Sequence, residues 1–288
     1  MITYHHIDIE GVTIFYRQAG LLDRPVFLLL HGFPSAGHMF RDLIPVLEHD
    51  FYIIAPDYPG FGNSDAPDRS EFAYTFDNLT VIMEKLLSKL EITSYAMYVF
   101  DYGAPIGFRL AARHPQQITA IISQNGNVYQ EGLGEKWAAR KQFWQHPTEE
   151  QRQRYRSTFD PNMIRHQYTD GTPAHTVSPD GYTLDSLYMS RPGNDEKQLD
   201  LIYDYRTNVD LYPLFQHYLR EHQPPLLAVW GQNDASFIPA GAHAFAQDVP
   251  NAEIHLLDTG HFALETHAKT IGNLIVDFWQ RRCHSSHT

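Results

Sequence analysis

The residue with the clearest chemical meaning in this sequence is an aspartate that follows an apolar run and precedes small residues. The run Tyr95–Phe100 leads directly into Asp101, and Gly103 and Ala104 come next. This pattern is typical of the sharp strand-to-helix turn that exposes a nucleophile, and most such turns carry serine. A carboxylate instead displaces a leaving group from saturated carbon and forms an alkyl ester. Asp101 therefore indicates hydrolysis through an alkyl-enzyme ester.

An acid and a histidine follow this aspartate along the chain, each after another apolar run. Asp234 ends the polar segment after Leu226–Trp230, and His261 comes after the last apolar run. The order nucleophile, acid, histidine is the one that accompanies such a turn. We therefore predict Asp101, Asp234 and His261 as the catalytic residues, with Asp234 orienting the imidazole. Asp258 is the rival for the acid's role, but we expect it to satisfy loop amides.

Two backbone N–H groups can complete this site. The segment 30–34 follows a buried run, and Gly32 permits a tight turn that leaves the Phe33 N–H free to point into a site. The N–H of Tyr102 can supply a second donor directly after the turn aspartate. Paired donors of this kind stabilise the oxyanion that forms when water attacks an ester. We therefore predict the N–H groups of Phe33 and Tyr102 as the oxyanion hole.

No serine has a comparable setting in the sequence. The segment 62–66 fits the spacing small-x-Ser-x-small around Ser64, but it follows a proline–glycine loop and no amphipathic helix comes after it. Ser123 lacks small residues two positions away on either side. We interpret the first as a turn and expect no serine nucleophile.

Short apolar runs alternate with helical patterns over most of the chain, which predicts a mostly parallel sheet with helices on both faces. Thr75 fits an N-cap for a helix that reaches Leu90, and further helices are predicted over 103–113 and about 263–280. The predicted strands are Ile7–Glu10, Thr13–Gln18, Val26–Leu30, Phe51–Pro56, Tyr95–Phe100, Ile118–Ser123, Leu226–Trp230 and Glu253–Leu257, the first two as an antiparallel pair.

The alternation breaks down between Asn127 and Tyr212. This segment is rich in Gln, Arg, Tyr and Trp, contains several prolines and reads as helices and loops. Because a structureless loop of that length is rare in a compact domain, we predict a helical insertion. The expected organisation is an α/β core formed by residues 1–127 and 216–288, with a helical cap over 128–215.

Composition narrows the class of protein. The chain has 288 residues, 43% of them hydrophobic, with 22 basic against 34 acidic residues and a net charge of −12. Such a balance disfavours binding to nucleic acid or anionic membranes, and the longest apolar stretches are too short to cross a bilayer. No signal-peptide pattern opens the sequence, so we expect a cytoplasmic protein.

The seventeen histidines raise the question of a metal site. The sequence contains no His-Glu-x-x-His, no cysteine pair and no calcium-type loop, so we predict neither a metal nor a cofactor. His5, His6, His284 and His287 lie near the ends, where solvated residues are expected. Cys283 is the single cysteine, so no internal disulfide can form.

Together these segments resemble the α/β-hydrolase superfamily, specifically its aspartate-nucleophile branch of epoxide hydrolases and haloalkane dehalogenases. His31-Gly-Phe-Pro34 and the stretch Ala55-Pro-Asp57 with Gly60-Phe-Gly62-Asn-Ser64-Asp65 are similar to signatures of that family. The resemblance covers the whole chain. It implies an eight-stranded, mostly parallel sheet flanked by helices, with the insertion as a helical cap.

Three positions depart from the family pattern. Both groups usually place Trp directly after the nucleophile, where this chain has Tyr102. Haloalkane dehalogenases carry Asn or Glu at the position of Phe33, and that side chain holds the departing halide together with the indole N–H. Because Phe33 has no side-chain donor, the usual halide site is absent. Val99 slightly favours a dehalogenase, because epoxide hydrolases more often carry glycine at this position.

The resemblance therefore favours an epoxide-hydrolase-like enzyme acting with water on a small, largely apolar substrate. In epoxide hydrolases cap tyrosines protonate the opening oxygen, and spacing does not choose among the candidates here. These are Tyr129, Tyr155, Tyr168, Tyr182, Tyr188, Tyr203, Tyr205 and Tyr212. The alternatives are a haloalkane or haloacid dehalogenase and, outside enzymes, a ligand-binding protein on the same scaffold. The sequence does not indicate an oligomeric state.

Overall fold

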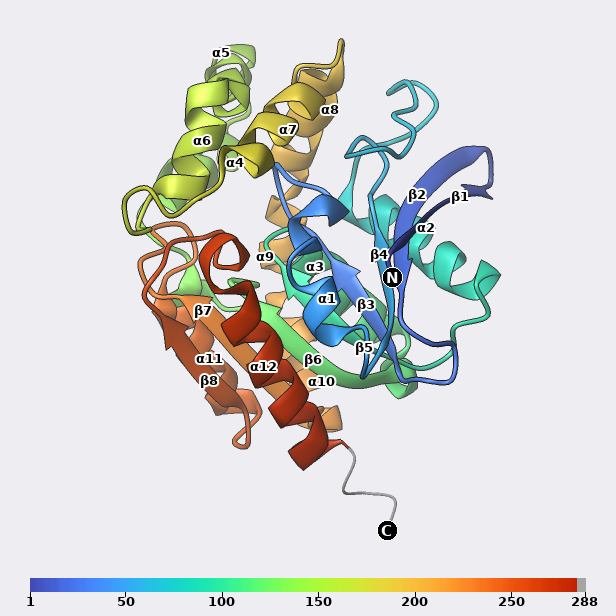
Figure 1. Ribbon diagram of the computed structural model, residues 1–288. Helices are drawn as coiled ribbons and strands as arrows, with labels where there is room; N and C mark the ends of the chain where they lie inside the picture. The colour runs from blue at the N-terminus through green and yellow to red at the C-terminus, as the bar shows by residue number, and fades with distance from the viewer. Residues whose placement is uncertain (284–288) are drawn as a thin grey trace.

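The computed structural model describes residues 1–283, and its centre is one eight-stranded sheet (Figure 1). The strand order is β1-β2-β4-β3-β5-β6-β7-β8. Strand β2 pairs antiparallel with β1 and β4, and the other neighbours are parallel. The strands are β1 (Thr3–Ile9), β2 (Val12–Ala19), β3 (Val26–Leu30), β4 (Tyr52–Pro56), β5 (Tyr95–Phe100), β6 (Ile118–Gln124), β7 (Leu226–Gly231) and β8 (Glu253–Leu257).

This sheet confirms the predicted fold class, and all strands but β1 lie within one residue of their predicted limits. Strand β1 begins at Thr3 rather than Ile7, so it includes His5 and His6; His6 is exposed, as predicted, and His5 is half-buried. An edge strand buries only one side, so polar residues can extend it, and the His5 ring stacks on Tyr16 of β2 at 5.1 Å. His284 and His287 lie outside the described residues.

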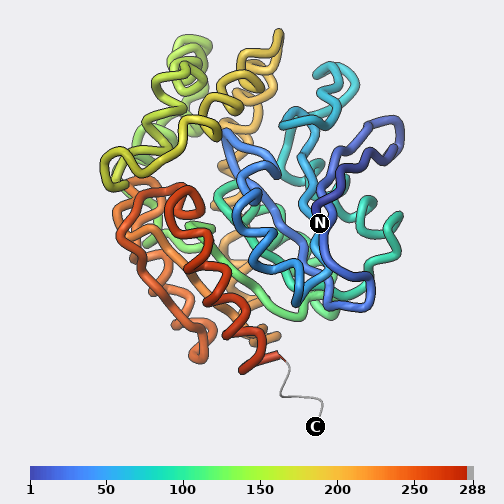
Figure 2. The backbone as a smooth tube through the Cα atoms, viewed as in Figure 1, coloured from blue at the N-terminus to red at the C-terminus, as the bar shows by residue number. Residues whose placement is uncertain are grey.

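Helices cover both faces of the sheet (Figures 1 and 2). On one face α1 (Ile44–Leu47) and α12 (Leu264–Arg282) pack on a core that includes Leu29. On the other, the core includes Leu28. Successive side chains of a strand point to opposite faces, which explains this division. The second face is covered by α2 (Phe76–Lys89), α3 (Gly103–Arg113), α10 (Tyr212–His222) and α11 (Pro239–Asp248).

A helical insertion lies between β6 and β7, over the edge of the sheet where the parallel strands end (Figure 1). The predicted domain limits at 127 and 215 remain predictions. The insertion consists of α4 (Trp137–Gln145), α5 (Glu149–Arg154), α6 (Pro161–Thr169), α7 (Pro179–Met189), α8 (Asn194–Asp204) and α9 (Arg206–Asp210). Short 3₁₀ turns complete the structure: η1 (Gly37–Phe40), η2 (Pro115–Gln117), η3 (Gln130–Gly132) and η4 (Tyr155–Phe159).

A buried polar network joins the insertion to the core. His38 of η1 has its Nε2 atom 2.6 Å from Oδ1 of Asp185 on α7. The hydroxyl of Tyr168 on α6 donates to the other oxygen of the same carboxylate. Asp185 is fully buried, and such a group is stable only with its hydrogen bonds satisfied. The network therefore fixes α6 and α7 over the sheet edge.

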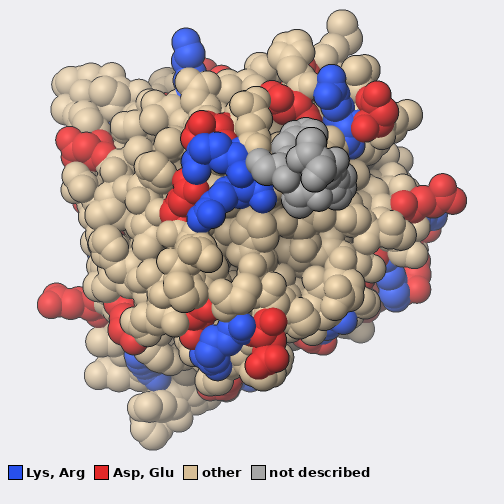
Figure 3. All heavy atoms as spheres, turned by 90° about the horizontal axis from the view of Figure 1, so that it is seen from below, with Lys and Arg blue, Asp and Glu red and all other residues tan. Residues whose placement is uncertain are grey.

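The surface on the side away from the insertion carries acidic and basic side chains interspersed (Figure 3). Arg281 and Arg282, for example, both donate to Glu253. Among residues 1–283, no helix is both long and apolar enough to cross a membrane.

Candidate active site

Asp101 lies in a sharp turn between β5 and α3. Its φ of 47° places it in the left-handed region, which is uncommon for residues other than glycine. The glycines nearby allow the close packing this turn needs: a Cβ on Gly32 would lie 2.4 Å from the Asp101 Cβ, and one on Gly103 would lie 2.2 Å from the Leu30 carbonyl oxygen. The turn thus holds the carboxylate at the carboxyl ends of the strands, where ligands bind in parallel sheets.

Both backbone donors predicted from the sequence contact this carboxylate. The N–H groups of Phe33 and Tyr102 each donate to Oδ1 of Asp101 at 2.7 Å. Within residues 1–283 the second oxygen, Oδ2, accepts no hydrogen bond, and the imidazole of His261 lies within ion-pair distance of it. The two carboxylate oxygens therefore have different environments: one is held by the backbone and the other is available to a substrate.

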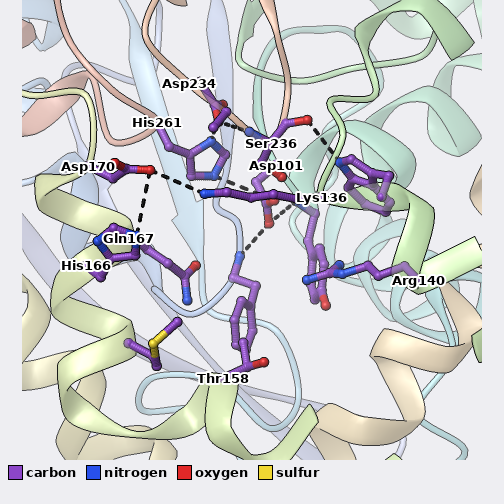
Figure 4. A pocket seen from close by; sticks show the side chains of 15 residues that line it. Asp101, Lys136, Arg140, Thr158, His166, Gln167, Asp170, Asp234, Ser236 and His261 are labelled. Carbon is purple, nitrogen blue, oxygen red and sulfur yellow. Dashed lines mark hydrogen bonds and ion pairs between the residues drawn. The ribbon is translucent and has the colours of Figure 1, made fainter. Parts of the chain in front are cut away.

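The structure also brings the predicted acid and histidine to Asp101 (Figure 4). Nδ1 of His261 lies 2.6 Å from Oδ2 of Asp234, and Nε2 lies 3.7 Å from Oδ2 of Asp101. The first distance is a hydrogen bond and the second is too long for one. Because Nδ1–H donates to a carboxylate, the neutral imidazole carries its lone pair on Nε2, on the side of Asp101.

Two groups that we did not predict hold Asp234. The side-chain amide of Asn125, directly after β6, donates to Oδ2 of Asp234 at 2.9 Å, and the Ser236 N–H donates to Oδ1 at 2.7 Å. Asn125 is buried with φ of 45°. The only sequence signal for Asn125 is its position directly after a parallel strand, because polar residues there lie at the edge of the sheet where ligands bind.

Burial and neighbouring charges shift the pKa values of both Asp101 and His261. Burial raises the pKa of Asp101 above its ordinary value, although His261 and the two N–H donors oppose the shift. Burial works against protonation of His261, but the Asp234 and Asp101 carboxylates outweigh it and raise its pKa. Perturbed pKa values on neighbouring groups in a cavity are typical of functional sites.

The alternative candidates for the acid and for a serine nucleophile make local contacts in loops. Oδ1 of Asp258 accepts from the side-chain amides of Asn233 and Gln232, so the loop role expected for it is confirmed. The Ser64 hydroxyl donates to the Asp57 carbonyl at 2.6 Å. The Ser123 hydroxyl donates to the Gly126 carbonyl at 2.8 Å. Both serines thus serve local structure.

A cavity of about 230 Å³ lies over Asp101, between the core loops and the insertion (Figure 4). The insertion contributes charged and polar side chains to its wall, among them Lys136, Arg140, Thr158 and Gln167. Lys136 is paired with Asp170 at 3.3 Å. In the part of the chain that the structure describes, no group of three or more His, Cys, Asp or Glu side chains is placed to hold a metal ion.

The cavity-lining phenol is not one of the eight candidate tyrosines of the insertion region, none of which lines it. It belongs to Tyr102, whose buried hydroxyl makes no well-formed hydrogen bond within residues 1–283. Tyr205 packs behind it, with ring centroids 5.8 Å apart. Other candidates are engaged elsewhere: the Tyr129 hydroxyl donates to Asp248, for example. Tyr102 is therefore the candidate proton donor, because it directly follows Asp101 in the turn. Sequence spacing could not show which tyrosines of the insertion reach the cavity.

Comparison with known proteins places this site in a family. A model of the alpha/beta hydrolase fold matches residues 25–268. The chain is 44% identical over 282 residues to the uncharacterized hydrolase YNR064C of Saccharomyces cerevisiae, covering 96% of this chain and 97% of the yeast protein. It is 24% identical over 257 residues to epoxide hydrolase 4 of Mus musculus, covering 81% and 66% of the two chains.

The fold is also that of a solved dehalogenase. The crystal structure of haloalkane dehalogenase DbeA from Bradyrhizobium elkani superposes with a TM-score of 0.82 at 24% identity, over 99% of this chain and 100% of the other. With hydrolases as its relatives, the alternative of a non-catalytic binding protein loses its support. The chain belongs to the α/β-hydrolase fold family, and it is a hydrolase.

Proposed function

We propose that this hydrolase uses Asp101 as a nucleophile and forms a covalent alkyl ester, most closely in the manner of an epoxide hydrolase. The observation that carries the proposal is the unequal environment of the two Asp101 oxygens. Two N–H groups hold Oδ1 at 2.7 Å, while Oδ2 lacks a hydrogen bond from the described chain and lies 3.7 Å from the imidazole. Oδ2 is thus the oxygen that attacks carbon.

In the first step Oδ2 of Asp101 forms a bond to a ring carbon, and the carbon–oxygen bond of the epoxide breaks. The electron pair stays on the ring oxygen, which takes a proton from the Tyr102 hydroxyl. Burial raises the pKa of Tyr102 above its usual value, so the hydroxyl is protonated in the resting enzyme. A phenol remains a stronger acid than an alcohol, so the transfer to an alkoxide is favourable.

In the second step His261 removes a proton from water, and the water oxygen attacks the carboxyl carbon of the ester. Negative charge then develops on Oδ1, which the Phe33 and Tyr102 N–H groups already face. Loss of one such donor typically costs about 10²–10³ in rate. Asp234 stabilises the imidazolium, which returns its proton to the departing alkoxide as the intermediate collapses and the diol forms. The second proton of the water, left on the Asp101 carboxyl group, returns to the Tyr102 phenolate, which restores both the carboxylate and the phenol.

The donors in the cavity favour an epoxide over a halide. A departing halide needs N–H donors but no proton. The indole N–H of Trp137 is bonded to the Ser236 carbonyl at 3.0 Å, and that of Trp144 to the Ile202 carbonyl at 3.1 Å. Phe33 offers no side-chain donor. An alkoxide needs the O–H that Tyr102 supplies.

Dehalogenation is the second candidate function, because one cavity cation is available to a halide. Within residues 1–283 the Arg140 guanidinium has no carboxylate partner, and it lies over the Trp137 ring at 4.8 Å. A panel of 1,2-epoxybutane, glycidate, 1-bromobutane and bromoacetate separates the two functions. Diol from the epoxides supports the first, and bromide release without diol formation supports the second.

Isotope transfer in a single turnover tests the covalent step itself. We expect wild-type enzyme in excess over substrate, in H₂¹⁸O, to release product whose new oxygen is ¹⁶O, while ¹⁸O enters Asp101. The product takes the carboxylate oxygen because Oδ2 becomes its alkyl oxygen. Mass spectrometry of the product and of the Asp101 peptide measures both. Heavy oxygen in the first-turnover product would show direct attack by water and contradict the proposal.

The pH dependence of the two steps should differ. Ester hydrolysis needs neutral His261, so its rate falls as pH drops through the pKa of that imidazole. Ester formation needs ionised Asp101 and the protonated Tyr102 hydroxyl, so it continues until pH falls to the pKa of Asp101, which burial raises. We expect wild-type enzyme to accumulate the ester at pH values below the pKa of His261 and above that of Asp101, and to release it on return to neutral pH. Intact-mass measurement across pH checks this; no accumulation at any acid pH would count against the assignment of His261 to the second step.

A further inference from the structure

The cavity contains one cation, Arg140, that makes no salt bridge within residues 1–283. Arg140 projects from α4 into the cavity and is half-buried. It lies over the Trp137 ring, and no carboxylate in residues 1–283 pairs with it. Lys136, on the same wall, is paired with Asp170 at 3.3 Å. The charge of Arg140 acts on Asp101 and on the Tyr102 hydroxyl without a direct carboxylate contact, so an anionic ligand gains a charge-assisted contact with this partly desolvated group.

Neutral donors surround the same space. The side chains of Thr158 and Gln167 line the cavity with Arg140 and make no hydrogen bond within the described chain (Figure 4). Both are only partly exposed. These side chains come from three separate elements: η4, α6 and α4. A hydroxyl and an amide without hydrogen-bond partners, next to a planar guanidinium that contacts the Tyr102 hydroxyl and the Trp137 ring, are donors that a carboxylate can use.

We infer that the substrate carries a carboxylate, which Arg140 binds on the insertion side of the cavity while the reactive carbon meets Asp101. The inference rests on the proposed function and names its substrate class. The negative charge of Asp101 contributes as well, because it repels the substrate's anionic end from the nucleophile and leaves the electrophilic end there. Arg140 thus orients the substrate, and its positive charge favours substrates that carry a carboxylate.

Glycidate and glycidamide test this inference because they differ only in having a carboxylate or a neutral amide on the same epoxide. We expect wild-type kcat/KM to be at least about tenfold higher for glycidate. In Arg140→Gln the ratio of the two kcat/KM values should fall about 10- to 100-fold, chiefly through KM for glycidate, since a charge-assisted hydrogen bond is lost. Thr158→Val should lower the same ratio by a smaller factor.

Lys141→Gln is the matched control. Lys141 is the next residue on α4, is absent from the cavity lining and donates to Gln130, so its removal changes the net charge equally but should leave the ratio unchanged. An equal effect of both variants would reduce the result to long-range charge and overturn the inference. So would equal kcat/KM for the two substrates, or no reaction with glycidate.

Failure of the inference and failure of the proposed function give different results. If glycidate is inert but 1,2-epoxybutane yields diol with ¹⁶O in the first turnover, the covalent mechanism stands and the carboxylate subsite is refuted. If no epoxide or bromide on the panel reacts or labels Asp101, both are refuted.

Discussion

Replacing Asp101 by Asn should lower kcat/KM for any epoxide that the enzyme hydrolyses by at least about 10⁴-fold, the size of effect seen when a triad nucleophile is removed. The amide is close to isosteric, and its oxygen can still accept the two N–H donors that hold Oδ1 at 2.7 Å. What it lacks is the anionic oxygen opposite His261. The loss should therefore appear in the chemical step, and steady-state kinetics with intact-mass spectra would measure it.

Asp258→Asn is the control for this experiment. Asp258 is a neighbouring exposed acid on the loop before His261, and it holds only the amides of Asn233 and Gln232. Its replacement should leave kcat/KM within about twofold, because exposed substitutions outside a site have small effects. Near-normal turnover by Asp101→Asn with unchanged thermal stability would remove this carboxylate from the mechanism.

The strands, and the loops that bring Asp101, Asp234 and His261 together, could be predicted from the sequence because both depend on local signals. A strand buried on both faces is a continuous apolar run, such as Val26–Leu30, and its limits are where the run stops. The three residues predicted as catalytic follow such runs, Asp101 directly and Asp234 and His261 within four residues, so locating β5, β7 and β8 also located them. The exception, β1, lies at the sheet edge, where apolar continuity is not required.

The cavity wall could not be predicted, since it depends on contacts between distant segments. Arg140 and Lys141 are adjacent residues of one short helix, yet only Arg140 lines the cavity. Nothing in the spacing of α4 distinguishes the two, because an insertion helix with a mostly polar surface has no strong apolar period. The sequence predicts a role for the Tyr102 N–H alone, whereas in the structure its phenol lines the cavity and the tyrosines of the insertion do not.

The division of labour between core and insertion follows from these contacts. The core turn holds Asp101 and the two N–H groups that donate to it, while the insertion supplies charged and polar side chains to the cavity wall. The link through His38 and Asp185 holds α7 to the core with a 2.6 Å hydrogen bond, so the two halves of the cavity keep their separation. In the proposed function, chemistry and substrate selection therefore come from different stretches of the chain.

Replacing His261 by Gln should stop the reaction at the ester. Ester formation needs no base, so the variant should react once with substrate, whereas hydrolysis should slow by about 10²–10⁴-fold without a general base. The mass gained also identifies the leaving group: an epoxide adds its whole mass, whereas an alkyl bromide adds its mass less hydrogen bromide. The modified tryptic peptide should be 90–109, which contains Asp101.

The double variant Asp101→Asn/His261→Gln should gain no mass, which ties the adduct to the proposed nucleophile. His243→Gln is the histidine control: His243 is exposed on α11 and lies outside the cavity lining, so it should turn over without accumulating adduct. Free product from His261→Gln at the wild-type rate, with no adduct, would mean that the imidazole is not the base for ester hydrolysis. Because Oδ1 would still be held by the Phe33 and Tyr102 N–H groups, slow hydrolysis of the trapped ester should persist and should quicken as pH rises and hydroxide replaces the missing base.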